Sequence, residues 1–366
     1  MSTGYIWHER FGFHDTGTAA GWMQPGGFVQ PLRHLESPES KQRLAALIAV
    51  SGLDVHLTRL APRETTDEEL LRVHSRAHLD HVAAASDAPR GGLCEDGFSP
   101  IGPGSDGVAR LAAGAAIVAV DAVMSGDVDN AYVLSRPPGH HATRHQGQGF
   151  CIYNNMAVAI AHARAELGVG RIAVVDWDVH HGNGTQDLFY DDGDVLTISI
   201  HQNGLFPSDT GHITEVGEGA GAGANINVPL PAGSGGDAYR AAVGEVALAA
   251  VERFAPDLVV VGCGYDASMY DPMARQMLTA STFRDLMTMT MATAAGVCDG
   301  RLVAVHEGGY SPEYVPFCGI AVLEQLCGHR TEVVDPFERT VLRIPGQEMT
   351  VLQRASIDAA RDVMSL

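Results

Sequence analysis

The sequence contains five short runs of apolar, mostly β-branched residues, and segments of helical character separate several of them. The runs are AYVLS (131–135), RIAVVDWD (171–178), VLTISIH (195–201), DLVVVGCG (257–264) and RLVAVHEGG (301–309). Runs of this length that stay apolar throughout predict strands that are buried on both faces. Helical patterns at 154–167, 236–254 and 281–297 lie between them, and such alternation predicts an α/β fold with helices covering a parallel sheet.

No repeat, low-complexity tract or long linker divides the 366 residues. We therefore expect a single domain over 1–366, with a core over about 1–330. The segment after residue 330 is expected to be a C-terminal extension that carries a helix over 353–366.

The chain has 44 acidic and 24 basic residues, a formal net charge of −20. This charge repels phosphate backbones, so we expect no nucleic-acid partner. It would favour a cationic ligand, although an acidic solvated surface explains it equally well. No window approaches eighteen consecutive apolar residues, and the first residues lack the basic and apolar regions of a signal peptide. We therefore expect no membrane partner and a cytoplasmic location.

Polar residues collect where the predicted strands end. The run at 131–135 is followed by RPPGHH, the run at 171 ends in DWDVHH, and the last two runs end in GYD and HEGGY. In an open parallel sheet, ligands bind outside the carboxyl ends of the strands. The sequence therefore predicts one site assembled from distant segments at this edge.

Within DWDVHH, the period of two in an extended segment places Asp178 and His180 on the same side. Asp266, at another strand end, could supply a third ligand to a divalent ion. Three protein ligands leave open positions for water and substrate, as in catalytic rather than structural zinc sites. A single Asp-x-His carries little weight, but its coincidence with polar residues at several strand ends favours a metal site.

His140 and His141 follow a rigid Pro-Pro-Gly, and Asp176 and Asn183 remain as acceptors that could orient their rings. An imidazole held in this way is suited to acid-base catalysis. Tyr310, after two glycines, could donate a hydrogen bond to a developing oxyanion. Taken singly, the histidine pair could be a surface feature and the tyrosine could pack under a loop.

The motifs RPPGHHA, GFCIYNN, DWDVHHGNGTQ, SIHQ, GYDASMYDP and EGGYS, in this order, resemble the histone deacetylase family. The resemblance runs from the amino terminus to about residue 330 and is closest to the class II and bacterial histone deacetylase-like amidohydrolase branch. It implies a three-layer α/β/α fold of the arginase and deacetylase type, with an eight-stranded parallel sheet. It also implies an enzyme that hydrolyses an acetyl or related acyl group from the ε-amine of lysine or a similar amine.

The resemblance assigns roles to individual residues. It implies one zinc ion per chain, held by Asp178, His180 and Asp266. His141 would be the principal general base and acid and His140 an electrostatic helper, with the division between them left open. The remaining assignments are Asp176 as the partner of His140, Asn183 as the partner of His141, and Tyr310 as the group that polarises the carbonyl.

The resemblance also implies a narrow substrate channel and bound potassium. The channel residues would be Gly149, Phe150 and Phe206 in the walls, Met273 at the gate and Asp96 at the rim. A structural potassium ion would lie near Asp176, Asp178, His180, Ser199 and Ile200, and a second near Phe189 and Val195.

Several alternatives stay open. An acylated lysine peptide and a small acylated amine both fit as substrate, and an acetylpolyamine hydrolase is the main rival. Met273, an apolar residue after Asp271-Pro272, argues weakly against polyamines. A binuclear ureohydrolase of the arginase type would need a D-x-H-x-D pattern, which Gly182 breaks. A non-enzymatic acyl-ligand sensor would be expected to lack Tyr310, a tandem histidine or a zinc ligand. We also expect a homo-oligomer.

Overall fold

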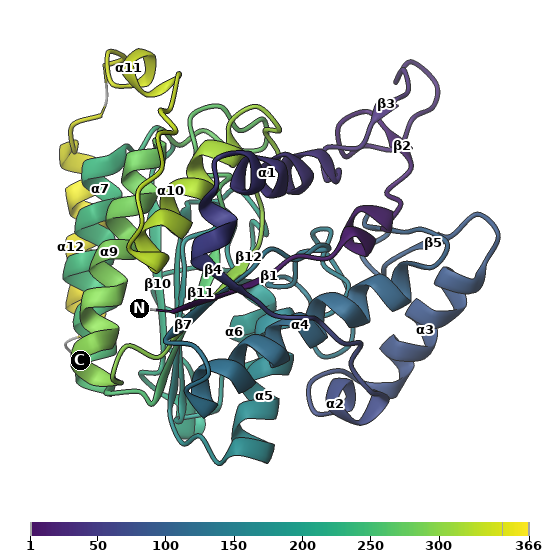
Figure 1. Cartoon of the computed structure of the whole chain (residues 1–366), viewed down its shortest axis with the longest axis horizontal. Helices are drawn as coiled ribbons and strands as arrows, with labels where there is room; N and C mark the ends of the chain where they lie inside the picture. Colours follow the sequence, from purple (N-terminus) through teal and green to yellow (C-terminus); the bar gives the residue numbers. More distant parts are fainter. Residues whose placement is uncertain (1, 346, 365–366) are drawn as a thin grey trace.

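The computed structural model describes residues 2–345 and 347–364 and is built around one eight-stranded parallel sheet (Figure 1). The strand order is β10-β9-β8-β11-β12-β7-β1-β4, and every neighbouring pair is parallel. The bounds are β1 Thr3–Ile6, β4 Leu57–Arg59, β7 Asn130–Val133, β8 Ile172–Asp176, β9 Val195–Gln202, β10 Asn225–Leu230, β11 Leu258–Cys263 and β12 Leu302–His306. This sheet confirms the predicted fold class.

The sheet separates two hydrophobic cores, because successive side chains of a strand point to opposite faces. In β8, Ala173 and Val175 belong to one core, whereas Ile172 and Val174 belong to the other. β11 and β12 divide their side chains in the same way. Strands buried on both faces cannot alternate apolar and polar residues, which is why they are recognisable as continuous apolar runs.

Helices cover both faces of the sheet, giving three layers (Figure 1). One core is closed by α1 Glu39–Val50, α7 Gly236–Ala241, α8 Ala249–Phe254, α9 Ala280–Val297, α10 Val315–Cys327 and α12 Val351–Met364. The other is closed by α2 Asp67–Leu71, α3 Arg76–Asp87, α4 Ser105–Ser125, α5 Asn155–Leu167 and α6 Asn183–Phe189. The short helix α11, Glu338–Val341, lies between α10 and α12 in the chain. Two small antiparallel pairs, β2 Thr18–Ala19 with β3 Leu32–Arg33 and β5 Gly92–Leu93 with β6 Pro100–Ile101, lie outside the sheet.

The structure changes three details of the sequence-based expectations. Strands β1, β4 and β10 were not among the apolar runs, because β1 and β4 are short and the edge strand β10 contains Pro229. The helix expected over 236–254 contains a π-helical segment, Ala242–Leu248, between α7 and α8. The last helix begins at Val351 rather than at residue 353, because Thr350 and Gln353 exchange hydrogen bonds at its start. Its expected end at 365–366 lies outside the described residues. That the whole chain is one domain stays a prediction.

Among the described residues, α4 alone is long and apolar enough to cross a membrane, by length and composition. Its apolar side chains, such as Leu111, Ile117 and Val120, are buried in the core beneath the sheet. A helix that packs against a sheet on one side and against another helix on the other side needs apolar residues around most of its surface, without any membrane. The predicted absence of a membrane partner is not tested by this helix.

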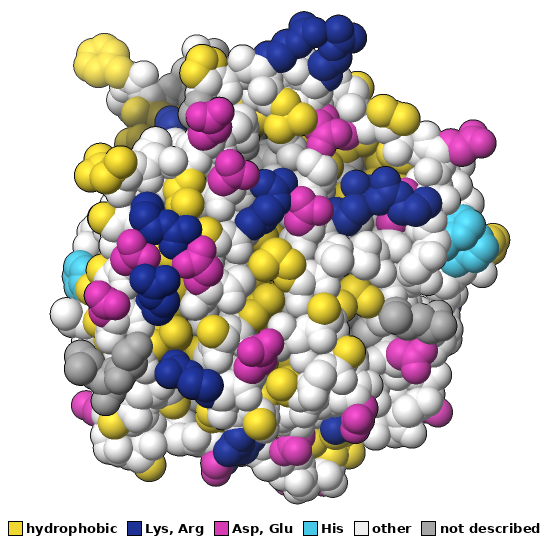
Figure 2. Space-filling model, turned by 90° about the vertical axis from the view of Figure 1, so that its left-hand side faces the viewer, with side chains coloured by type: hydrophobic (Ala, Val, Ile, Leu, Met, Phe, Trp, Pro, Cys, Tyr) yellow, Lys and Arg dark blue, Asp and Glu magenta, His cyan; other side chains and the backbone are white. Residues whose placement is uncertain are grey.

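The face formed by α7, α9 and α12 carries interspersed basic and acidic side chains (Figure 2). Arg354 lies 2.6 Å from Glu245, and Arg240 lies 2.8 Å from Asp285. Exposed pairs of this kind stabilise a fold by only about 0–1 kcal/mol each. Acidic and basic side chains are thus mixed on this face.

Candidate metal centre and active site

Four adjacent strands, in the order β8-β11-β12-β7, end at the same edge of the sheet. The chain that follows β8 carries Asp178 and His180, and the chain that follows β11 carries Asp266. The chain that follows β12 carries Tyr310, and the chain that follows β7 carries the tandem histidines. The parallel arrangement thus brings together residues from four distant segments, as predicted from the polar strand ends.

Asp178, His180 and Asp266 form the candidate metal centre. One potential ligand atom from each of the three lies within 4.8 Å of the others. His180 Nδ1 is 3.1 Å from Asp178 Oδ1 and 3.1 Å from Asp266 Oδ2, and both carboxylates are fully buried. Two buried carboxylates beside an imidazole are the donor set that suits a divalent cation such as zinc.

The two carboxylates are held by main-chain donors from neighbouring loops. Gly308 N donates to Asp178 Oδ2 at 2.7 Å, and Val179 N donates to Asp266 Oδ1 at 2.9 Å. A Cβ on Gly308 would lie 2.1 Å from Asp266 Oδ2, so only glycine allows this approach. The EGG motif therefore orients the candidate metal ligands as well as turning the chain toward Tyr310.

His140 and His141 lie side by side, with ring centroids 4.0 Å apart, and their partners differ. His140 Nδ1 is 2.9 Å from Asp176 Oδ2, whereas His141 Nδ1 is 2.8 Å from Asn183 Oδ1. The structure thus brings together both pairs that were predicted. Because an amide oxygen only accepts, His141 carries its proton on Nδ1 and has a free lone pair on Nε2.

Burial and neighbouring charges shift the pKa values of the two histidines in opposite directions. Burial lowers the pKa of His140, but the carboxylates of Asp178 and Asp176 outweigh it and raise the pKa to about 10. Burial lowers the pKa of His141 well below its ordinary value, and the neighbouring His140 and His180 lower it further. These opposite shifts favour the charged form of His140 and the neutral form of His141.

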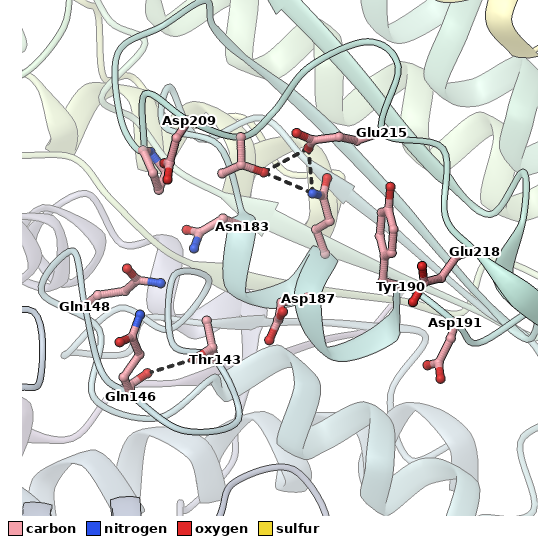
Figure 3. A pocket seen from close by; sticks show the side chains of 13 residues that line it. Thr143, Gln146, Gln148, Asn183, Asp187, Tyr190, Asp191, Asp209, Glu215 and Glu218 are labelled. Atoms are coloured by element: carbon pink, nitrogen blue, oxygen red, sulfur yellow. Dashed lines mark hydrogen bonds between the residues drawn. The ribbon is translucent and has the colours of Figure 1, made fainter.

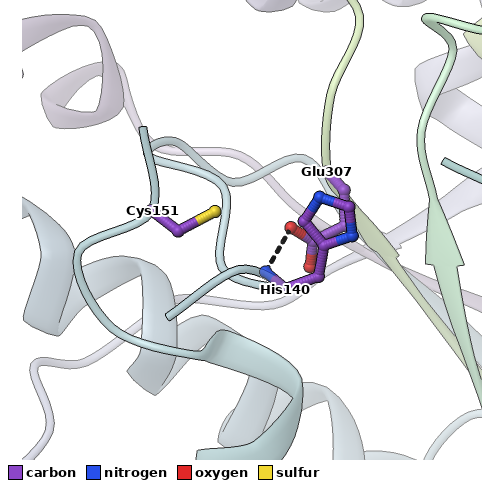
Figure 4. Close-up of side chains that lie close together, drawn as sticks. All are labelled: His140, Cys151 and Glu307. Carbon is purple, nitrogen blue, oxygen red and sulfur yellow. Dashed lines mark hydrogen bonds between the residues drawn. The ribbon is translucent and has the colours of Figure 1, made fainter. Parts of the chain in front are cut away.

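Glu307 holds the tandem-histidine loop in place, a role that the sequence analysis did not assign. Its Oε2 accepts hydrogen bonds from Gly139 N at 2.6 Å and from His140 N at 3.1 Å, and Figure 4 shows the second of these bonds. Burial raises the pKa of this carboxyl to about 7. Cys151 completes a second group of close potential ligands with His140 and Glu307, but burial raises its pKa well above the ordinary value. A thiol that stays protonated is a poor metal ligand.

A largely apolar channel of about 370 Å³ leads to the metal centre. It is lined by Trp22, Phe98, His141, Gly149, Phe150, His180, Leu205, Phe206, Met273 and Tyr310. The predicted wall and gate residues are all in this lining, and so is the ring of Tyr310. Trp22, Phe98 and Leu205 were missed, because they lie in loops and belong to no motif or periodic pattern.

Gly149 and Phe150 both adopt left-handed backbone conformations, with φ of 55° and 69°. A Cβ at position 149 would lie 2.3 Å from the ring of His141, so the narrow wall requires glycine. Phe150 is held in this uncommon conformation by a hydrogen bond from its amide to Ser99 Oγ at 2.8 Å. In this conformation Phe150 lines the channel.

Asp96 is not in the channel lining among the described residues. Its carboxylate accepts hydrogen bonds from the main-chain amides of Phe98, Ser99 and Gly149, at 2.9 to 3.1 Å. These bonds tie the loop around residue 96 to the channel wall. Its contact with a substrate backbone stays a prediction, and the structure gives it a structural role that the sequence analysis did not expect.

The residues predicted to bind the first potassium ion lie in and just after β8 and in β9. Asp176 and Ser199 are paired across β8 and β9, and Ser199 Oγ is 2.9 Å from His201 Nδ1. Ile200 follows Ser199 in β9. Phe189 ends α6 and Val195 begins β9, and the carbonyl of Phe189 already accepts a hydrogen bond from Asp192 N at 3.1 Å. Both potassium sites stay predictions.

The histone deacetylase domain family matches residues 34–326, which include every residue of this site except Trp22. The chain belongs to the histone deacetylase family. This confirms the resemblance found in the motifs. Membership makes the protein a hydrolase of the deacetylase and amidohydrolase type.

Individual relatives agree with this assignment. The chain is 48% identical over 360 residues to a histone deacetylase-like amidohydrolase of Pseudomonas aeruginosa, covering 97% of this chain and 94% of the relative. It is 36% identical to a probable deacetylase of Archaeoglobus fulgidus, over 90% of this chain and 87% of that protein. The solved HDA15 HD domain superposes with a TM-score of 0.85 at 30% identity, covering 99% of this chain and 94% of that domain.

Proposed function

We propose that the protein is a zinc-dependent deacylase that removes an acetyl or related acyl group from the ε-amine of lysine or a lysine-like amine. One observation carries the proposal: Asp178, His180 and Asp266 converge at the inner end of an apolar channel that Tyr310 and His141 also line. An apolar channel suits the methylenes of an acyl-lysine side chain, and the polar groups meet the amide at its end.

Zinc held by Asp178, His180 and Asp266 would polarise the acyl carbonyl and make a water molecule easier to deprotonate. The chain's own residues account for the remaining steps. His141 Nε2 takes a proton from the attacking water while its Nδ1–H stays bonded to Asn183 Oδ1. The same nitrogen then returns the proton to the leaving amine, so that the amide C–N bond breaks and a carboxylate and an amine are released.

Tyr310 and His140 stabilise charge during these steps. The Tyr310 hydroxyl makes no hydrogen bond to another residue in the described part of the chain, so it is free to donate to the carbonyl oxygen as that oxygen becomes negative. Burial raises the pKa of this hydroxyl well above its ordinary value, so it remains a donor. His140, ion-paired with Asp176, places a fixed positive charge beside His141.

An acetylpolyamine is the second candidate substrate. Among the described residues, the channel lining contains no Asp or Glu side chain that would hold a distal ammonium group, and Met273 occupies the gate. This lining favours an acyl-lysine, whose side chain is uncharged beyond the amide. The excess of acidic residues over basic ones still suits a cationic substrate outside the channel.

The test compares amine release from an acetyl-lysine peptide and from N-acetylputrescine, using metal-stripped protein with and without one equivalent of zinc. We expect cleavage that depends on zinc and is faster with the peptide. Asp266→Asn should abolish both zinc binding and cleavage, whereas Glu252→Gln, a change on the exposed side of α8, should leave both unchanged. Zinc binding without cleavage of either compound would refute the acetyl-amine assignment.

A further inference from the structure

Most charged side chains of this protein are exposed or half-buried, and water screens their charges. The hollow of about 580 Å³ beside α6 is an example (Figure 3), because four of the carboxylates that line it are exposed: Asp187, Asp191, Asp209 and Glu218. A buried charge is screened far less, and it costs free energy when no counter-ion touches it. A buried cationic side chain therefore needs a structural or a functional reason.

Lys41 and Arg136 are the fully buried Lys and Arg side chains in the described part of the chain. Arg136 Nε is 2.8 Å from Glu36 Oε1, so these two buried groups balance each other. Within the described residues, the ammonium group of Lys41 forms no hydrogen bond and no ion pair at 4.0 Å or less. Lys41 is also distinctive in the sequence, since it alone is a lysine among the 24 Lys and Arg residues of the chain.

The ammonium group of Lys41 lies over the ring of Tyr310. Lys41 Nζ is 5.9 Å from the centroid of that ring, and the two side chains belong to residues that are 1% and 6% exposed. A cation within about 6 Å of an aromatic face is attracted to it, and more strongly when both groups are desolvated. The rings of Phe150 and His180 meet the Tyr310 ring edge to face, with centroids 5.8 Å and 6.3 Å away. One cation and two rings therefore hold the ring of Tyr310.

The positive charge of Lys41 also acts on the candidate metal centre. Burial lowers the pKa of Lys41 and Arg136 lowers it further, whereas the carboxylates of Glu36, Asp266 and Asp178 oppose this shift and favour the charged form. Arg136 already balances Glu36. The two candidate metal ligands, Asp178 and Asp266, are therefore the carboxylates that Lys41 is left to balance, across a site where burial weakens screening.

We propose that Lys41 is a positioning residue for the deacylation: its ammonium group holds the Tyr310 ring in the channel wall and strengthens the Tyr310 hydroxyl as a hydrogen-bond donor. The inference rests on the proposed deacylase function. A nearby cation stabilises the negative charge that the phenol oxygen gains as it donates to an oxyanion, so its effect is largest in the transition state. The same charge opposes that of a bound zinc ion, so it lowers zinc affinity.

The choice of lysine fits this role. An ammonium group is a compact charge on a flexible stem, whereas a guanidinium group is a planar fork that is best satisfied by paired acceptors. Arg136, with its hydrogen bonds to Glu36 Oε1, Phe11 O and His14 O, shows what a buried arginine needs in this protein. Over the ring of Tyr310, a single charge suffices.

The first test is Lys41→Met, which keeps an unbranched side chain of similar length and removes the charge. We expect kcat for an acetyl-lysine peptide to fall about tenfold with little change in KM. Zinc affinity, measured by competition with a chelator, should rise about threefold. Urea unfolding at saturating zinc should show equal or higher stability, since replacing an unpaired buried charge by an apolar group is neutral or stabilising. A merely structural role would instead lower kcat, zinc affinity and stability together.

Three further variants test whether the effect passes through the charge and the Tyr310 hydroxyl. Lys41→Arg keeps the charge, so it should keep wild-type zinc affinity and lose less kcat than Lys41→Met. In Tyr310→Phe, which lacks the hydroxyl, adding Lys41→Met should lower kcat no further. Arg343→Met removes an exposed positive charge and should leave kcat, zinc affinity and stability unchanged.

Unchanged kcat in Lys41→Met would overturn the proposal, and so would an equal loss of kcat with and without the Tyr310 hydroxyl. Unchanged or weaker zinc binding in Lys41→Met would also overturn it, and this measurement needs no turnover. A wild-type protein that binds zinc but cleaves no acetyl-lysine peptide would refute the deacylase function instead. The two failures are therefore distinguishable.

Discussion

Replacing Glu307 by Ala removes the acceptor of two buried main-chain donors, Gly139 N at 2.6 Å and His140 N at 3.1 Å. Each buried N–H left without an acceptor costs about 1–3 kcal/mol, so the free energy of unfolding should fall by about 2–6 kcal/mol. Because these amides position the tandem-histidine loop, kcat should fall more than KM changes. Glu307 acts here as a positioning residue, through the main chain of His140.

Glu307→Gln separates the hydrogen bonds from the charge. The Gln oxygen can accept from both amides. Since the pKa of Glu307 is about 7, the carboxyl that it replaces is only partly ionised at neutral pH, so the substitution should cost less than about 1 kcal/mol per bond, or less than about 2 kcal/mol in total. Urea unfolding at fixed zinc and the kcat and KM for an acetyl-lysine peptide are measured for both variants. Glu313→Ala, in the same loop but exposed, should change stability by no more than about 0.5 kcal/mol. Wild-type stability and kcat in Glu307→Ala would refute the reasoning.

Three other predictions follow from the same structure. Tyr310→Phe should lower kcat about a hundredfold through loss of an oxyanion donor, with zinc content unchanged; unchanged kcat would remove the hydroxyl from the mechanism. Gly308→Ala should weaken zinc binding at least tenfold, since its Cβ would lie 2.1 Å from Asp266 Oδ2; normal zinc content after dialysis would contradict this. Burial opposes ionisation of Glu36, but the charges of Arg136, Lys41 and His14 together outweigh it and lower the pKa of this carboxyl to about 2. Because this pKa is depressed, the stabilisation is complete above about pH 4.5 and is lost as the pH falls toward 2, on the order of 3 kcal/mol. Unfolding at pH 5 and pH 3 checks it, and Glu36→Gln should show a smaller difference.

Much of the fold could be predicted from the sequence, because the central strands of the sheet are buried on both faces and therefore form continuous apolar runs. β8, β9, β11 and β12 stand out as apolar runs, and helices of regular period separate several of them. The strands toward the edges of the sheet could not be predicted in this way. β4 has three residues, and β10 alternates polar and apolar residues and contains Pro229, so neither carries the pattern of a buried strand.

The candidate metal ligands were predictable for a related reason. Asp178 and His180 are two residues apart in an extended segment, so their common direction follows from local geometry. That Asp266 and Tyr310 would join them followed from the parallel sheet, whose strands end at one edge. The role of Glu307 was not predictable, because its contact with the loop after β7 depends on the exact loop path and not on any local pattern.

The sequence by itself therefore determined the strand and helix types, the family, and the residues that reach the carboxyl edge of the sheet. These properties depend on local periodicity and on short motifs. Only the tertiary structure decided which oxygen faces which nitrogen: the pairing of His140 with Asp176 and of His141 with Asn183, and the hydrogen bonds from Gly139 N and His140 N to Glu307. Burial and charge at these positions come from residues far apart in the chain, and electrostatic interactions depend on distance in space rather than along the sequence.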